Sequence, residues 1–172
     1  MQAALASGVT TVRDCGGTAE VIIPVARAVD SGLLVGPRIV TAGAPITSTG
    51  GHCWFLQNEA EGAEQLRRAV RRMHKAGADF IKVMVTGGGS TAGSNPRASQ
   101  YRQDELDAIV EDAHRLELAV SGHVHGTEGI ERAVIAGFDT LEHCTWLHRN
   151  EDGEEDYRPD VVAQIRDRGI YV

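Results

Sequence analysis

A unit of amphipathic helix, glycine and short apolar strand recurs along this chain, and it constrains the fold more than any other feature. In residues 61–77 apolar side chains recur at helical spacing, the pattern stops at Gly77, and the apolar segment 78–85 follows. Helices of the same kind are expected in five further ranges: 1–8, 18–32, 103–118, 127–137 and 159–169. Strands are expected near residues 9, 38, 80, 119, 139 and 170.

This alternation predicts an α/β fold in which helices cover a parallel sheet. Two architectures fit it, a doubly wound open sheet and a (β/α)8 TIM barrel. The dinucleotide-binding fingerprint G-x-G-x-x-G is absent from the sequence. Polar residues instead close several strands, and candidate site residues spread over many strand ends favour a barrel. These residues are Asp14, Lys82, His123, His125 and His143.

Six expected strands are fewer than the eight of such a barrel, and the chain ends in IYV, inside the last expected strand. We therefore expect a partial barrel that holds about strands 2 to 7. Residues 1–172 would form a single partial barrel domain, truncated at both ends.

Charge and composition exclude several function classes. The chain has 17 Lys and Arg against 24 Asp and Glu, and its net charge of -7 gives no basic surface for nucleic acid or an anionic membrane. No apolar run reaches the roughly 18 residues that cross a bilayer. The three cysteines have no C-x-x-C spacing and form no disulfide framework. We expect a cytoplasmic protein with no nucleic-acid or membrane partner, and a homo-oligomer stays open.

Lys82 and three histidines are the candidate chemical groups. Lys82 lies in the apolar run DFIKVMV, where an unpaired ammonium is costly to bury. His123 and His125 stand two apart and point to one face of a strand, and His143 closes the next strand. Neutral imidazoles so placed are natural zinc ligands.

The amine of a lysine can react with CO2 to give an anionic carbamate that bridges two divalent ions. The plainer alternative is a lysine that reaches solvent and histidines that are hydrogen-bonded in the core.

Five motifs in order along the chain resemble the amidohydrolase superfamily: VTTVRDCGG, TGGHCW, FIKVMVTGGG, VSGHVHG and LEHC. More narrowly, the sequence is similar to metal-dependent dipeptidases of the prolidase-like and Xaa-Arg carboxypeptidase-like group, which are related to imidazolonepropionase. The spacings carry the resemblance, with 41 residues from Lys82 to His123 and 20 from His123 to His143.

The resemblance implies a (β/α)8 barrel with two divalent metal ions, usually Zn2+. A carboxylated Lys82 would bridge the two ions, and His123 and His143 would bind one of them. His125 would line the site as a catalytic and substrate-binding residue, and His52 would contact the substrate.

Parts of the family pattern are missing from this sequence. The H-x-H motif of the first strand would lie upstream of Met1, and the aspartate of the eighth strand would lie downstream of Val172. The sequence would thus carry about half of the ligand set.

The resemblance implies a metal-dependent hydrolase that cleaves an amide or peptide C–N bond of a small molecule or dipeptide. Two alternatives stay open. One is a cyclic-amide hydrolase or deaminase of the same superfamily, although such enzymes commonly lack the bridging lysine. The other is a non-catalytic fragment with a half-built metal site.

The segment 148–160, HRNEDGEEDYRPD, is an acidic insertion after the fifth of the six expected strands. It is either a solvated loop or a lid that favours cationic substrates.

Overall fold

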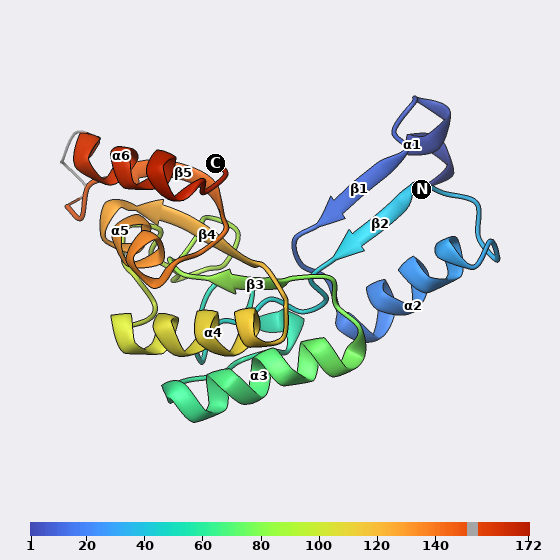
Figure 1. Cartoon of the computed structure of the whole chain (residues 1–172), viewed down its shortest axis with the longest axis horizontal. Helices are drawn as coiled ribbons and strands as arrows, with labels where there is room; N and C mark the ends of the chain where they lie inside the picture. Colours follow the sequence, from blue (N-terminus) through green and yellow to red (C-terminus); the bar gives the residue numbers. More distant parts are fainter. Residues whose placement is uncertain (151–154) are drawn as a thin grey trace.

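The computed structural model describes residues 1–150 and 155–172, and its elements alternate as the sequence predicts (Figure 1). The strands are β1 (Thr11–Asp14), β2 (Arg38–Thr41), β3 (Ile81–Met84), β4 (Val120–Gly126) and β5 (Thr140–Leu147). The helices are α1 (Gln2–Ala6), α2 (Ala19–Asp30), α3 (Gly62–Ala76), α4 (Gln103–Arg115), α5 (Thr127–Ala136) and α6 (Pro159–Arg168), with a 3-10 turn, η1 (Trp54–Leu56).

The paired strands are parallel, but they form two sheets and not the single sheet that the sequence pattern suggests. One sheet pairs β1 with β2, and the other has the order β3-β4-β5. The chain after β2 crosses from the first sheet to the second. Ile46 there donates its N–H to the carbonyl of Lys82 over 2.8 Å and accepts from the N–H of Met84 over 2.8 Å.

The expected strand near residue 170 is also wrong in its extent. Within the described residues it is reduced to one parallel bridge between Thr140 and Tyr171. Tyr171 and Val172 are exposed, so this end of the chain gains little from packing.

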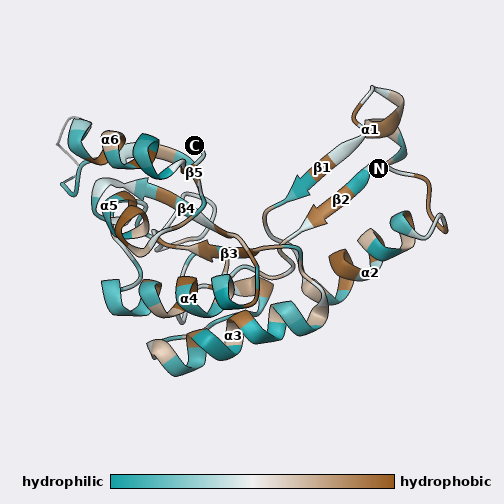
Figure 2. Cartoon of the chain, viewed as in Figure 1, coloured by the Kyte–Doolittle hydropathy of each residue, from teal (hydrophilic) through white to brown (hydrophobic). Residues whose placement is uncertain are grey.

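Burial on both faces explains why the sequence around β3 is an almost continuous apolar run. All four of its residues are buried, as expected for a parallel strand covered on both faces. Ile81 and Val83 belong to the main hydrophobic core with Leu106 of α4. Alternation turns Lys82 and Met84 to the opposite face, where both line a cavity. Figure 2 shows β3 in hydrophobic colours, whereas α3 and α4 are largely hydrophilic on the side in view.

Two aspartates that lie just before strands join each strand to its predecessor in the same way. Asp79 donates its N–H to the carbonyl of Thr41 and accepts the N–H of Thr41 on its carboxylate, both over 2.8 Å. Asp139 makes the same pair of hydrogen bonds with Val120, over 2.9 and 2.7 Å. The first pair joins β2 to β3, and the second joins β4 to β5.

Among the described residues, none of the helices combines the length and the hydropathy that crossing a bilayer requires.

Candidate metal centre

A cavity of about 420 Å³ opens at the carboxyl ends of the second sheet. Lys82 and the histidines expected to form the site line it, whereas Asp14 does not and instead accepts a hydrogen bond from the Thr41 hydroxyl over 2.9 Å. Its polar lining includes His52, Lys82, His123, His125, Glu142 and His143.

Three histidines form a triangle in this cavity. The ring centroids of His123, His125 and His143 lie 4.6 to 4.7 Å apart, and their candidate ligand nitrogens all lie within 4.8 Å of one another. His123 is only 7% exposed, whereas His143 is exposed. Three imidazole nitrogens at this spacing fit the donor set of a divalent transition-metal ion.

An irregularity in β5 brings His143 into the triangle. Val124 pairs with His143, but Gly126 pairs with Leu147, so β5 contains two extra residues in this stretch. His143, Cys144 and Trp146 there have positive φ angles of 73°, 48° and 54°. In a regular strand the neighbours Glu142 and His143 would point to opposite faces. The left-handed backbone turns both of them into the cavity.

Lys82 is buried in the wall of the cavity, with 3% exposure. Burial lowers the pKa of its amine to about 8, although the charge of Glu142 acts to raise it. The amine donates a long hydrogen bond of 3.5 Å to the Ser121 hydroxyl. A lysine in this setting loses its proton far more readily than a lysine in solvent.

The histidines are held in their neutral form. Burial, together with the neighbouring histidines and Lys82, lowers the pKa of His123 to about 3. The pKa values of His52, His125 and His143 are lowered as well, in each case mainly by burial. Neutral imidazoles keep a lone pair free for a metal ion.

His52 lies beside the triangle of histidines as a fourth imidazole, and His125 of the triangle has a further polar contact. The ring of His52 lies 4.5 Å from that of His123. Its Nδ1 atom is buried and has no hydrogen-bond partner among the described residues, so it is free to meet a ligand. The Nδ1 atom of His125 lies 2.9 Å from the hydroxyl of Thr145.

Four polar residues of the site were missed by sequence reasoning. The Ser121 hydroxyl donates to Oε1 of Glu142 over 3.1 Å, and Arg13 donates to the same oxygen over 2.6 Å. Cys15 accepts a long hydrogen bond from Arg13, and burial raises the pKa of its thiol. The strand period of two could have found Ser121, because it stands two residues before His123.

The acidic segment 148–160 is described in part, since residues 151–154 lie outside the described residues. Arg97 donates to the carbonyl of His148 over 2.7 Å, at the start of the segment. The lid hypothesis stays a prediction.

Comparison with known proteins places the whole chain in one family. The sequence model of the amidohydrolase family matches residues 1–172. Ochratoxinase from Aspergillus niger is 36% identical over 168 residues, which cover 83% of this chain and 34% of that protein.

Solved structures give the same result. A Xaa-Pro dipeptidase with bound methionine superposes with a TM-score of 0.86 at 34% identity, over 96% of this chain and 42% of its own. A prolidase complexed with N-methylphosphonate-L-proline gives 0.83 at 30% identity, over 99% of this chain and 43% of its own. The chain thus spans about a third to two fifths of the length of these relatives. The expected α/β fold of amidohydrolase type, present here in part, is confirmed, and the chain belongs to the amidohydrolase family.

Proposed function

We propose that the protein carrying this chain is a metal-dependent hydrolase that cleaves an amide or peptide C–N bond, as a dipeptidase or amidase. The observation that carries the proposal is the triangle of neutral imidazoles beside a buried lysine in one cavity. Relatives described as ochratoxinase, Xaa-Pro dipeptidase and prolidase support it. The substrate would be a small molecule or a dipeptide.

Two divalent metal ions, with zinc as the proposed identity, fit the donor set of the site. We assign Lys82 in its carboxylated form, His123 and His143 as their ligands on this chain. The metal ions would lower the pKa of a bound water and polarise the scissile carbonyl. We assign His52 and His125 to substrate contact, with His125 also in a catalytic role, because both rings line the cavity beside His123.

The surroundings of Lys82 favour its carboxylation. With a pKa of about 8, roughly a tenth of the amine is neutral at pH 7, far more than for a lysine in solvent. The lone pair of the neutral amine forms a bond to the carbon of CO2, one C=O π pair moves onto oxygen, and the nitrogen loses one proton to water. The product is an anion, which suits a site that also collects positive charge.

Two broader assignments accompany this function. Residues 1–172 would form part of a single barrel domain, which the 34% to 43% coverage of the relatives supports. A cytoplasmic location is supported by the free thiols of Cys15, Cys53 and Cys144.

Replacement of the lysine tests the function. Lys82→Ala should remove most of the bound metal and the hydrolysis of dipeptide substrates, because the bridging ligand is lost. Metal content by mass spectrometry and hydrolysis rates would be compared with Lys75→Ala, which removes a lysine in the last turn of α3. Wild-type metal content and rate in Lys82→Ala would refute the bridging role. A wild-type protein that binds metal without hydrolysing any amide would instead support a non-catalytic site.

A further inference from the structure

A chain of polar contacts runs from β1 across the second sheet to the Lys82 amine. Arg13 on β1 donates through Nη1 to Oε1 of Glu142 over 2.6 Å and through Nη2 to the Thr140 hydroxyl over 3.0 Å. Oε1 of Glu142 also accepts from the Ser121 hydroxyl over 3.1 Å, and that hydroxyl accepts from Lys82 over 3.5 Å. The contacts thus link both sheets to the site.

Strand register places the residues of this series of polar contacts next to one another across the sheet. Lys82 on β3 pairs with Ser121 on β4, and Ser121 pairs with Thr140 on β5. Because the three strands are parallel, these residues lie side by side on the cavity face. Glu142 stands two residues after Thr140 and shares that face.

Arg13 is itself fixed from several sides. Its guanidinium lies 4.2 Å from the centroid of the Phe80 ring, in addition to its contacts with Glu142 and Thr140. A guanidinium held by a ring face and two acceptors gives Glu142 one defined orientation.

The lysine needs such a support because its own anchor is weak. Its side chain has many rotamers, and the one hydrogen bond that residues 1–150 and 155–172 give its amine, of 3.5 Å, selects poorly among them. The hydroxyl of Ser121 can hold the amine in place only if the hydroxyl is oriented, and its donor bond to Glu142 sets that orientation.

We propose that Arg13 and Glu142 are positioning residues that, through Ser121, hold the Lys82 amine where its carboxylated form faces the histidine triangle. This inference rests on the proposed function, since it assumes that Lys82 becomes carboxylated. The inference assigns Glu142 a task distinct from metal binding, although Glu142 is the neighbour of His143 in sequence.

The experiment measures carbamate directly. The protein is equilibrated with 13C-bicarbonate, the carbamate signal is integrated by 13C NMR, and bound metal is counted in the same samples. Glu142→Ala should lower the carbamate occupancy by about fivefold or more, because Ser121 loses its acceptor. Glu142→Gln keeps an acceptor oxygen, so its carbamate occupancy should lie between those of the wild type and Glu142→Ala. Arg13→Lys should retain more carbamate than Arg13→Met.

A matched control separates positioning from general stability. Arg132 and Glu128 of α5 form an ion pair of 2.7 Å with 30% and 36% side-chain exposure, close to the 37% and 31% of Arg13 and Glu142. Glu128→Ala should leave the carbamate occupancy of folded protein unchanged. Wild-type occupancy in folded Glu142→Ala, Glu142→Gln and Arg13→Met would overturn the positioning role while the proposed function stands. No carbamate signal in the wild-type protein would overturn the carboxylation itself, and the inference with it.

Discussion

At the scale of single residues, Gly88 lies where the loop after β3 meets the two most buried histidines. A Cβ atom at this position would lie 2.5 Å from Nε2 of His52 and 2.8 Å from Nε2 of His123. Real Cβ atoms do not approach that closely, so any side chain here must displace the rings. The absence of a side chain at Gly88 therefore keeps both imidazoles in their places.

Gly88→Ala should weaken metal binding by about tenfold or more, because the rings of His52 and His123 must move out of position. Metal affinity, measured by competition with a chelator, checks this. Gly89→Ala is the matched control, since a Cβ there meets nothing within 4 Å. Equal affinities in the two variants would show that the approach at Gly88 does not position the rings.

The site could be predicted from the sequence where strand alternation holds. His123 and His125 are two residues apart on β4, and the structure places both in the cavity with Lys82. Glu142 could not be predicted, because alternation sets it on the face opposite to His143. The left-handed backbone at His143 and Cys144 brings His143 to the same cavity as Glu142, and no residue type at these positions announces that conformation.

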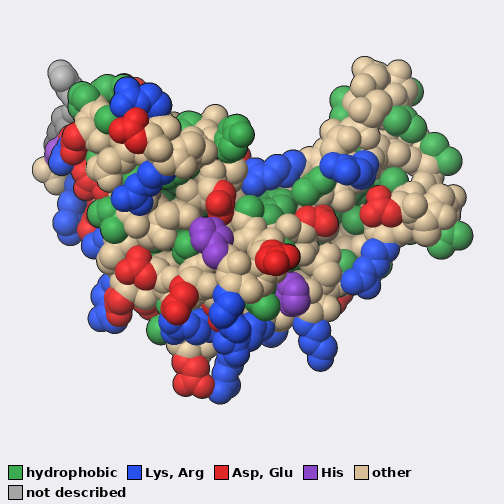
Figure 3. Space-filling view, in the orientation of Figure 1, with side chains coloured by type: hydrophobic (Ala, Val, Ile, Leu, Met, Phe, Trp, Pro, Cys, Tyr) green, Lys and Arg blue, Asp and Glu red, His purple; other side chains and the backbone are tan. Residues whose placement is uncertain are grey.

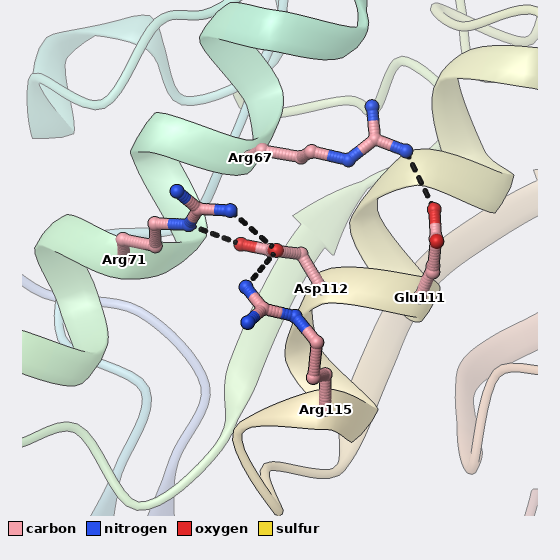
Figure 4. Close-up of polar contacts among 5 residues, drawn as sticks. All are labelled: Arg67, Arg71, Glu111, Asp112 and Arg115. Carbon is pink, nitrogen blue, oxygen red and sulfur yellow. Dashed lines mark hydrogen bonds and ion pairs between the residues drawn. The ribbon is translucent and has the colours of Figure 1, made fainter.

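At the scale of elements, a buried aspartate joins α4 to α3. Asp112 accepts from Nε and Nη2 of Arg71 over 2.8 and 2.9 Å, and from Arg115 over 2.6 Å (Figure 4). Hydrogen bonding to Arg71 is the main cause that lowers the pKa of Asp112 to about 2, against the effect of burial. Nearby, Arg67 and Glu111 form a second ion pair between the same helices, with Glu111 largely exposed.

Asp112→Asn should lower the free energy of unfolding at pH 7 by about 2 kcal/mol, since a carboxylate whose pKa is depressed in the fold stabilises that fold when ionised. This stabilisation is complete above the ordinary pKa of 3.8 and is lost as the pH falls toward 2. Urea unfolding at several pH values should therefore show the difference from wild type shrinking across this window.

Glu111→Gln provides the control for this prediction, because an exposed ion pair contributes little, about 0.5 kcal/mol. A pH-independent difference between Asp112→Asn and wild type would contradict the role of the ionised carboxylate. The helical periodicity predicted a helix in residues 103–118. It could not predict that Asp112 is buried, because Arg71, which makes two of its three hydrogen bonds, comes from another helix.

At the scale of the whole molecule, the sequence order of helices and strands was enough to predict parallel pairing, but not its division into two sheets. Figure 1 shows β1 and β2 together with α1 and α2 at one end, and β3, β4 and β5 at the other. Figure 3 shows a hollow between these two parts on the side in view. Apolar periodicity does not record which backbone groups pair, so the crossing at Ile46 had no signal in the sequence.

The join between the two parts depends on Asp79. Its carboxylate and N–H hold Thr41 at the end of β2, so Asp79→Ala should loosen β1 and β2 relative to β3. Hydrogen exchange of the β1 and β2 amides should then speed up by about tenfold, the effect of losing one charge-assisted hydrogen bond, while β3 to β5 keep their protection. Asp139→Ala removes the equivalent carboxylate hydrogen bond inside the second sheet, together with a contact to His114, and β4 and β5 there already share a ladder from Ser121 to Val124. It should therefore leave β1 and β2 unaffected, and equal acceleration of their amides in both variants would show that the two sheets unfold as one unit.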